Sequence, residues 1–220
     1  MAVVVAILCM TSDFAIRVLR LRINDRHAAA LRQRAWAVNQ GWNFCNELSF
    51  RHWERKRECM SAYDMQPYTK GGGKELGLHS QTVQAVQEEH CTRRRQHRKV
   101  KRRWRKSGGA RRSLGWIPLK KSAIRYRSGQ VWLSGFDRPL GLWDSYGLHQ
   151  YELGMGCISE DSRGRWYLKV TIRVKRSPAS LATQSVGIDL GLKEFFATSD
   201  GHKEEAQKFH RKLEPAIAAA

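Results

Sequence analysis

The sequence predicts an α+β fold in which a helical segment is inserted into a β-barrel, and three patterns carry this prediction. Residues Phe14–Ile23 and Trp166–Lys175 alternate apolar with basic or polar residues at the period of two that is typical of half-buried strands. Apolar residues between them recur at helical spacings of four and three, at Leu31, Ala35, Val38, Trp42 and Cys45. Further along, Val186–Lys193 and Phe195–Gly201 predict a β-hairpin.

The first strand explains why a barrel is expected. A lone strand cannot bury its apolar residues, and the strands after Trp116 offer the sheet that Phe14–Ile23 needs. These later strands include a hairpin with Ser128 and Gly129 at its turn. Residues 25–112 would then be inserted as helices, the first of them capped by Asn24 or Asp25.

The charge of the chain predicts a polyanionic partner. Forty Lys and Arg residues stand against twenty Asp and Glu residues, which gives a formal net charge of +20 for 220 residues. Nucleic acid is the first candidate partner and an anionic membrane surface is the second. A uniformly solvated basic surface is the alternative, and the clustering of the charge argues against it.

The strongest cluster follows a second helix, which Ser80 is predicted to cap. Like charges at helical spacing destabilise a helix, so we expect the cluster to be frayed alone and ordered on phosphate. A localisation signal or a solvated tail is the alternative. Trp104 lies among the basic residues of the cluster, which are Arg93, Arg94, Arg95, Arg98, Lys99, Lys101, Arg102, Arg103, Arg105 and Lys106.

Three further polar features of the sequence also allow predictions. Asn39, Asn43 and Asn46 lie off the apolar stripe of the first helix, where they either face a partner or are ordinary surface amides. The charged stretch from residue 51 to residue 74 has three glycines, Gly71–Gly73, near its end and predicts a loop or flexible connection. The late strand presents a cationic face suited to a nucleic-acid backbone, with Arg165, Lys169 and Arg173 as candidate contacts.

The cysteines and the termini exclude some classes of protein. The five cysteines include no C-x-x-C pair, so neither a zinc ribbon nor a dithiol redox motif is predicted, and a reducing cytoplasm is expected. Residues Ala2–Met10 are apolar but too few to span a bilayer, and no membrane segment is predicted. Residues Ser177–Ser180 break the strand pattern and predict a linker.

Asp189 is the main candidate for chemistry, because the hairpin pattern places it on a buried strand. Burying an ionised carboxylate costs several kcal/mol unless a cation or hydrogen bonds compensate it. Two roles remain open on the pattern alone. Asp189 either binds a metal ion or accepts hydrogen bonds from a nearby turn.

The order of these parts resembles that of TnpB (OrfB), a family of RNA-guided DNA endonucleases encoded by insertion sequences and related to type V CRISPR effectors. The likeness extends from Phe14 to about Leu213. Each motif is short, and it is the order and spacing of the motifs that make the resemblance specific. The motifs are Trp42-Asn43, Leu78–Gln84, Gly115–Pro118, Gly164–Leu168 and Gly187–Lys193.

The resemblance implies an arrangement of domains and a set of partners. Residues 14–24 and 113–176 would form a wedge-like β-barrel, and residues 25–112 an inserted helical recognition domain. Residues 185–220 would be the first hairpin and helix of an RNase H-like (RuvC) nuclease domain. The implied partners are guide-type RNA and DNA, in the cytoplasm of a bacterium and associated with the nucleoid when DNA is bound.

By the same resemblance, Asp189 is a catalytic residue and a Mg²⁺ ligand in a site that uses two further acidic residues. Glu194, Glu204, Glu205 and Glu214 do not stand where the family pattern places these ligands, and the chain ends before the motifs that would supply them. Two-metal hydrolysis needs enough carboxylates to hold both ions. We therefore expect a truncated protein with weak Mg²⁺ occupancy at most, no zinc site and no guided cleavage by this chain alone.

Two other functions stay open. The chain is either a non-catalytic regulator that uses its RNA- or DNA-binding half deliberately, or a plain ribosomal or RNA-binding protein whose Gly-Ile-Asp-Leu-Gly hairpin is a coincidence. The ending of the chain inside a predicted helix favours truncation over both.

Overall fold

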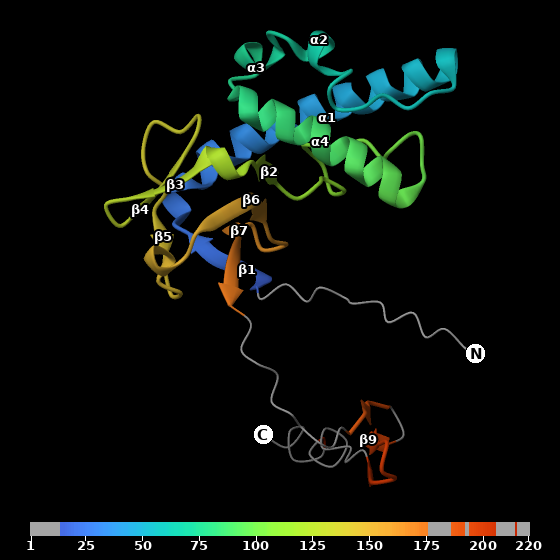
Figure 1. The fold of residues 1–220 in the computed structure, drawn as a ribbon, viewed down its shortest axis with the longest axis vertical. Helices are drawn as coiled ribbons and strands as arrows, with labels where there is room; N and C mark the ends of the chain where they lie inside the picture. Colours follow the sequence, from blue (N-terminus) through green and yellow to red (C-terminus); the bar gives the residue numbers. More distant parts are fainter. Residues whose placement is uncertain (1–13, 176–185, 192–193, 206–213, 215–220) are drawn as a thin grey trace, which may run out of the picture. The chain divides into compact units, whose positions relative to one another are not determined.

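The computed structural model describes residues 14–175, 186–191, 194–205 and 214. The chain divides into two compact units, Met1–Lys175 and Arg176–Ala220, and each is described by itself (Figure 1). The predicted linker at Ser177–Ser180 and the apolar segment at Ala2–Met10 lie outside the described residues. Within the described ranges, no helix combines the length and the apolar composition that crossing a bilayer requires.

An antiparallel five-stranded sheet organises the first unit. Its order is β2-β6-β7-β1-β5, and the two longest strands, β1 and β7, pair at nine positions from Phe14 opposite Lys175 to Arg22 opposite Tyr167. The expected pairing of the first strand with the later β-region is therefore confirmed. The strands are β1 (Phe14–Ile23), β2 (Trp116–Leu119), β5 (Leu142–Trp143), β6 (Leu153–Glu160) and β7 (Trp166–Lys175).

The expected closed barrel is not what the described residues form. Strand β2 pairs with β6 and strand β5 pairs with β1, and these two strands are the open edges of the sheet. Pro118 lies in β2 and has no backbone N–H to donate, which suits an edge position. Strand β5 has only two residues, too few to extend the ladder around to β2.

The first unit also holds two long helices and several short ones. Helices α1 (Ala28–Lys56) and α4 (Ser80–His97) lie side by side (Figure 1). The stretch predicted as one loop instead contains the end of α1 and two short helices, α2 (Gln66–Thr69) and α3 (Gly72–Glu75).

The helix caps differ from the predicted ones. Asn24 caps a single 3-10 turn, η1 (Asp25–His27), by accepting from the Arg26 N–H, and α1 begins after this turn. His79 rather than Ser80 caps α4, because its Nδ1 accepts from the Gln81 N–H at 3.3 Å. An imidazole nitrogen can serve this purpose as a side-chain oxygen does.

The core lies between the helices and the sheet. All five residues of the predicted helical stripe are buried on α1, and Trp166, Leu168, Val170 and Ile172 are buried on β7. Gly115 lies directly against the ring of Trp166, where an added Cβ would come within 2.1 Å of it. The sequence therefore needs glycine at the entry to β2.

A separate hairpin of the first unit confirms its predicted turn. Strands β3 (Ile124–Arg127) and β4 (Gln130–Leu133) pair in antiparallel fashion. Ser128 and Gly129 between them have φ angles of 49° and 75°, the two successive positive values of a tight hairpin turn. Two further 3-10 turns, η2 (Lys121–Ala123) and η3 (Leu148–Gln150), complete this unit.

The second unit contains the predicted hairpin and one additional strand. Strands β8 (Ile188–Asp189), β9 (Glu194–Thr198) and β10 (Lys203–Glu205) form a sheet in the order β10-β9-β8. The expected burial of Asp189 is wrong, since both residues of β8 are exposed and Ile188 has 64% of its surface accessible. A two-residue edge strand has one neighbour and leaves its faces open to solvent.

Candidate nucleic-acid interface

The basic cluster does not continue helix α4. The helix ends at His97, where Arg98 adopts a left-handed backbone conformation with φ of 50°. Residues 98–115 then run without helix or strand back to the start of β2. Successive helical turns of cations repel one another, and an extended course separates them. The cluster is thus divided between the last turn of α4 and an irregular segment.

Three buried asparagines of α1 hold this irregular segment. Asn46 donates from Nδ2 to the carbonyl of Arg102 and accepts the N–H of the same residue, both at 2.8 Å. Asn43 makes the same two bonds to Arg105, at 2.9 and 2.8 Å. Each amide side chain thus pairs with both backbone groups of one residue, as a neighbouring strand would. We call Asn39, Asn43 and Asn46 the asparagine clasp.

The third member of the clasp holds side chains. Asn39 accepts a hydrogen bond from Nε of Arg105 at 2.6 Å and donates to Oγ of Ser107 at 3.0 Å. The indole N–H of Trp42, on the same helix, donates to the carbonyl of Arg103 at 3.4 Å. The clasp residues are 0–8% exposed, so neither of their two expected roles, partner contacts or surface amides, is correct.

Some cations of the cluster serve the fold rather than a partner. Arg94 is buried, and its guanidinium donates to Oγ of Ser49 and to the carbonyl of Met60. Arg105 is partly buried, and burial lowers its pKa from the usual value for arginine. Arg93 and Lys101 form ion pairs with Glu89 and Glu47, respectively, on the helices.

The remaining cations of the cluster have no ion-pair partner in the part of the chain that the structure describes. All of them except Arg102 are exposed side chains. Because no carboxylate neutralises them, they are free to bind anions. They are Arg95, Arg98, Lys99, Arg102, Arg103 and Lys106.

An open pocket of about 1010 Å³ runs along this segment, and we call it the basic groove. None of its lining residues is a carboxylate, and most are cations. A surface concavity lined by one sign of charge concentrates its field and attracts ligands of the opposite charge. The lining residues are Trp42, His97, Lys99, Lys101, Arg102, Arg103, Trp104, Arg105, Lys106, Arg111 and Ser113.

A buried carboxylate anchors the far end of the groove segment to the sheet. Glu160, at the end of β6, accepts two bonds from the guanidinium of Arg112, at 2.6 and 2.9 Å, and one from the Gly115 N–H at 2.9 Å. These hydrogen bonds lower the pKa of the Glu160 carboxyl below its usual value, and those from Arg112 contribute most. The segment is therefore fixed by α1 over residues 102–107 and by β6 at its end.

A buried histidine lies beside the clasp. His90 on α4 is fully buried, and its ring packs edge-on against Trp42 with centroids 5.2 Å apart. Burial and the nearby Arg94 and Arg102 lower the pKa of His90 to about 4. The imidazole is therefore neutral at physiological pH and adds no charge to a region already crowded with cations.

The three candidate residues on or next to β7 make different kinds of contact. Arg165 forms an ion pair with Asp161 at 2.8 Å, Lys169 is half-buried, and Arg173 lies 4.9 Å from the ring centroid of Phe14. The pairing of β1 with β7 brings Arg20 opposite Lys169, and the guanidinium of Arg20 stacks on Tyr167 at 3.9 Å. This makes a second cationic surface on the sheet.

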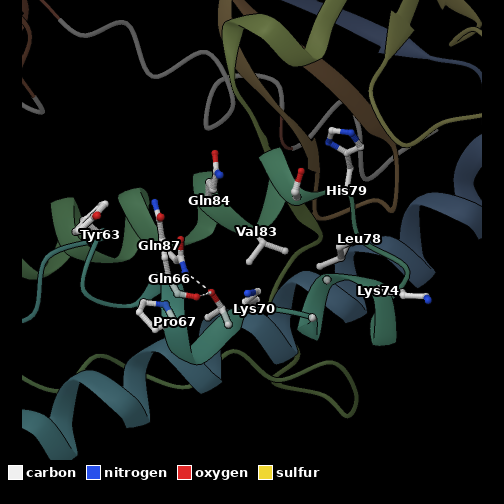
Figure 2. Close-up of a pocket in the computed structure, with 14 residues that line it drawn as sticks. Tyr63, Gln66, Pro67, Lys70, Lys74, Leu78, His79, Val83, Gln84 and Gln87 are labelled. Carbon is white, nitrogen blue, oxygen red and sulfur yellow. Dashed lines mark hydrogen bonds between the residues drawn. The ribbon is translucent and has the colours of Figure 1, made fainter.

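A further pocket, of about 850 Å³, lies between the short helices and α4 (Figure 2). Its lining is dominated by neutral side chains such as Gln66, Gln84 and Gln87, and Gln87 donates to Oγ1 of Thr69 at 2.6 Å. Its lining also includes two cations, Lys70, which follows α2, and Lys74 of α3 (Figure 2). Because it concentrates neither cations nor acidic groups, the basic groove is the stronger candidate site.

Asp189 does not lie in a metal site that the described residues form. No group of three or more His, Cys, Asp or Glu side chains in the described ranges could hold a metal ion. Glu194, its closest acidic neighbour in sequence, forms an ion pair with Lys203 at 3.1 Å. Mg²⁺ prefers several oxygen ligands, and one exposed carboxylate does not meet that preference.

Removing one member of the clasp should loosen the groove segment. We expect Asn46→Ala to lower the free energy of unfolding by about 1–3 kcal/mol, because the partly buried N–H and carbonyl of Arg102 are left without partners. Urea denaturation monitored by circular dichroism measures this decrease. Gln33→Ala, an exposed change on the same helix, is the control and should lie within about 0.5 kcal/mol of the wild type. Equal stability of both variants would show that the clasp bonds are not formed.

The Glu160 anchor predicts a dependence of stability on pH. Its pKa is lowered in the folded state, so its contribution is present above the unfolded pKa of about 4.3 and is lost as the pH falls through the folded value. Glu160→Gln should lower the free energy of unfolding by about 1–3 kcal/mol at pH 7 and by less at pH 3. Thermal melts of both proteins across this range check the prediction, and a difference that does not shrink at low pH would contradict it.

Comparison with known proteins finds a similarity over part of the chain. No protein-family model matches the chain. The chain is 30% identical over 101 residues to a Streptomyces pristinaespiralis protein named "Putative RNA-guided DNA endonuclease". These residues are 46% of this chain and 25% of that protein, so the match spans a quarter of the relative's length. The chain is thus similar, over less than half of its residues, to a protein of the class that its motifs resemble.

Proposed function

We propose that this chain is a nucleic-acid-binding protein related to the TnpB family and that the basic groove holds the phosphates of its ligand. The observation that carries the proposal is a concave row of cations without a lining carboxylate, held in place by buried amides. A segment fixed in this way presents its charges without the entropy cost of ordering a loop on binding.

The charge balance supports a polyanion as the ligand. The net charge of +20 repels copies of the chain from one another, and phosphates neutralise cations that the fold leaves unpaired. Each phosphate that is neutralised also releases counterions from the nucleic acid, which favours binding at low salt. An RNA with a fold of its own suits a preformed groove, and we propose guide-type RNA as the first ligand and DNA as the second.

We further propose that binding, rather than cleavage, is what this chain does alone. Asp189 is the one residue that the family resemblance assigns to catalysis here, and it is exposed on a two-residue strand. A hydrolytic site of this class acts as a unit and loses most of its rate when any member is missing. The second candidate function is a regulator that binds RNA or DNA without cutting it, and the same geometry supports it.

The groove should dominate the salt dependence of binding. In a triple variant with Lys99, Arg103 and Lys106 changed to Gln, we expect the slope of log K against log salt to become shallower by roughly 0.7–0.9 for each phosphate that the variant no longer neutralises. Fluorescence anisotropy of a labelled structured RNA between about 50 and 300 mM salt, and of duplex DNA in parallel, measures the slope. We expect the RNA to bind more tightly than the DNA.

The control removes the same charge from another surface. Arg125, Arg127 and Arg138 are exposed and lie on or after the β3–β4 hairpin, so their triple change to Gln also lowers the net charge by three. This control should reduce affinity slightly and leave the slope within about 0.5 of the wild-type value. Equal slopes for the two triple variants would mean that the groove is not the binding site.

Cleavage is tested separately with Asp189→Ala. We expect no Mg²⁺-dependent cutting of a DNA target by the wild-type chain with bound RNA, and no difference when Asp189 is replaced. A gel assay with labelled target strands measures this. Cutting that requires Mg²⁺ and disappears in Asp189→Ala would contradict the proposal and imply that other carboxylates complete the site.

A further inference from the structure

Trp104 has an unusual position in the basic groove. Its side chain is 55% exposed, although it lies in the middle of a segment that is fixed by hydrogen bonds on both sides. No other aromatic ring packs against it among the described residues, whereas Trp42 and Trp116 pack against each other with centroids 5.9 Å apart. An exposed tryptophan alone needs no explanation. The surroundings of this one point to a ligand.

The first surrounding feature is the rigidity of the backbone. Arg102 and Arg105, two residues before and one residue after Trp104, each have their backbone N–H and carbonyl bonded to a clasp amide. The carbonyl of Arg103 accepts from the indole of Trp42. The backbone at Trp104 is therefore restrained before any ligand arrives, and a planar ligand stacking on the indole need not order the chain first.

The second feature is the charge on either side. Arg103 and Lys106 are exposed and have no ion-pair partner among the described residues, and both line the groove together with Trp104. An aromatic platform between cations matches a nucleotide strand, whose bases offer flat π-faces and whose phosphates alternate with them. An apolar protein segment would leave these cations uncompensated.

Single strands and duplexes differ in whether a base offers a free face to the indole. Inside a duplex both faces of each base are already covered by the neighbouring base pairs, and a side chain reaches only the phosphates and the groove edges. An unpaired base has a free face for the indole. Resting on the proposed function of the groove, we infer that the basic groove binds an unpaired stretch of RNA or DNA, with one base stacked on Trp104 and the adjacent phosphates on Arg103 and Lys106.

The test compares three probes of equal length with the full chain: a single-stranded RNA of about 12 nucleotides without self-complementarity, the same backbone with abasic residues, and an RNA duplex of the same length. We expect the wild-type protein to bind the base-bearing strand about 5- to 100-fold more tightly than the abasic strand. Trp104→Ala should remove this preference and change affinity for the abasic strand and the duplex less than about twofold. The salt slope should stay unchanged, because no charge is removed.

Two further variants keep the test decisive. Trp104→Phe retains a flat ring and should keep affinity for the base-bearing strand within about fivefold of the wild type. Trp132→Ala removes an exposed tryptophan of β4, outside the groove, and should change nothing. The wild-type preference for bases over the abasic strand is a readout that does not depend on how any variant folds.

The outcomes separate this inference from the proposed function. No wild-type preference for bases, or an equal decrease in affinity for all three probes in Trp104→Ala, would overturn the stacking role while leaving the groove as a phosphate-binding site. Tighter binding of the duplex than of the single strand would also overturn it. If none of the three probes shows salt-dependent binding, the proposed function is overturned, and the stacking role with it.

Discussion

The pairing of asparagine side chains with backbone groups is the interaction on which the candidate site depends. Asn43 and Asn46 each satisfy one N–H and one carbonyl of a segment 56–62 residues away in sequence. Buried backbone groups without partners are costly, and an irregular segment lying on a helix has no ladder to supply them. The clasp replaces the missing strand and lets the segment 98–115 lie against α1 without regular secondary structure.

The clasp also resolves a conflict of charge. A helix that continued through the cluster would bring like charges together on successive turns, and a free loop would lose its conformational entropy whenever it bound a ligand. Holding the backbone by neutral amides leaves the unpaired cations available to a ligand, while Glu160 supplies one buried negative charge at the far end, bound to Arg112. The neutral state of His90 fits the same constraint, since burial lowers its pKa to about 4.

The elements that the sequence predicts best are those whose signal repeats over neighbouring residues. The alternation in β1 and β7, the buried stripe of α1 and the turn at Ser128-Gly129 were all predictable because each depends on neighbours in sequence. The roles of Asn39, Asn43 and Asn46 could not be predicted in this way, since their hydrogen-bond partners are 56–68 residues away in sequence. Their spacing of four and three, which places three amides on one helix face, was the available signal. The burial predicted for Asp189 was wrong because a hairpin pattern does not indicate what covers the faces of the hairpin. The predicted barrel was wrong because a pattern of strands does not determine which sheet edges pair.

Hydrogen exchange at the backbone amides of Arg102 and Arg105 measures directly whether the asparagine clasp holds the groove segment in the ligand-free protein. Both amides belong to half-exposed residues outside any helix or strand, where exchange is ordinarily fast. If the clasp holds them, their exchange in the ligand-free protein is slowed at least about tenfold relative to that of Lys99 on the same segment, and Asn46→Ala abolishes the protection of Arg102. Exchange of all three amides at the rate of an unstructured peptide would show that the clasp does not hold the segment and that the groove has no fixed wall.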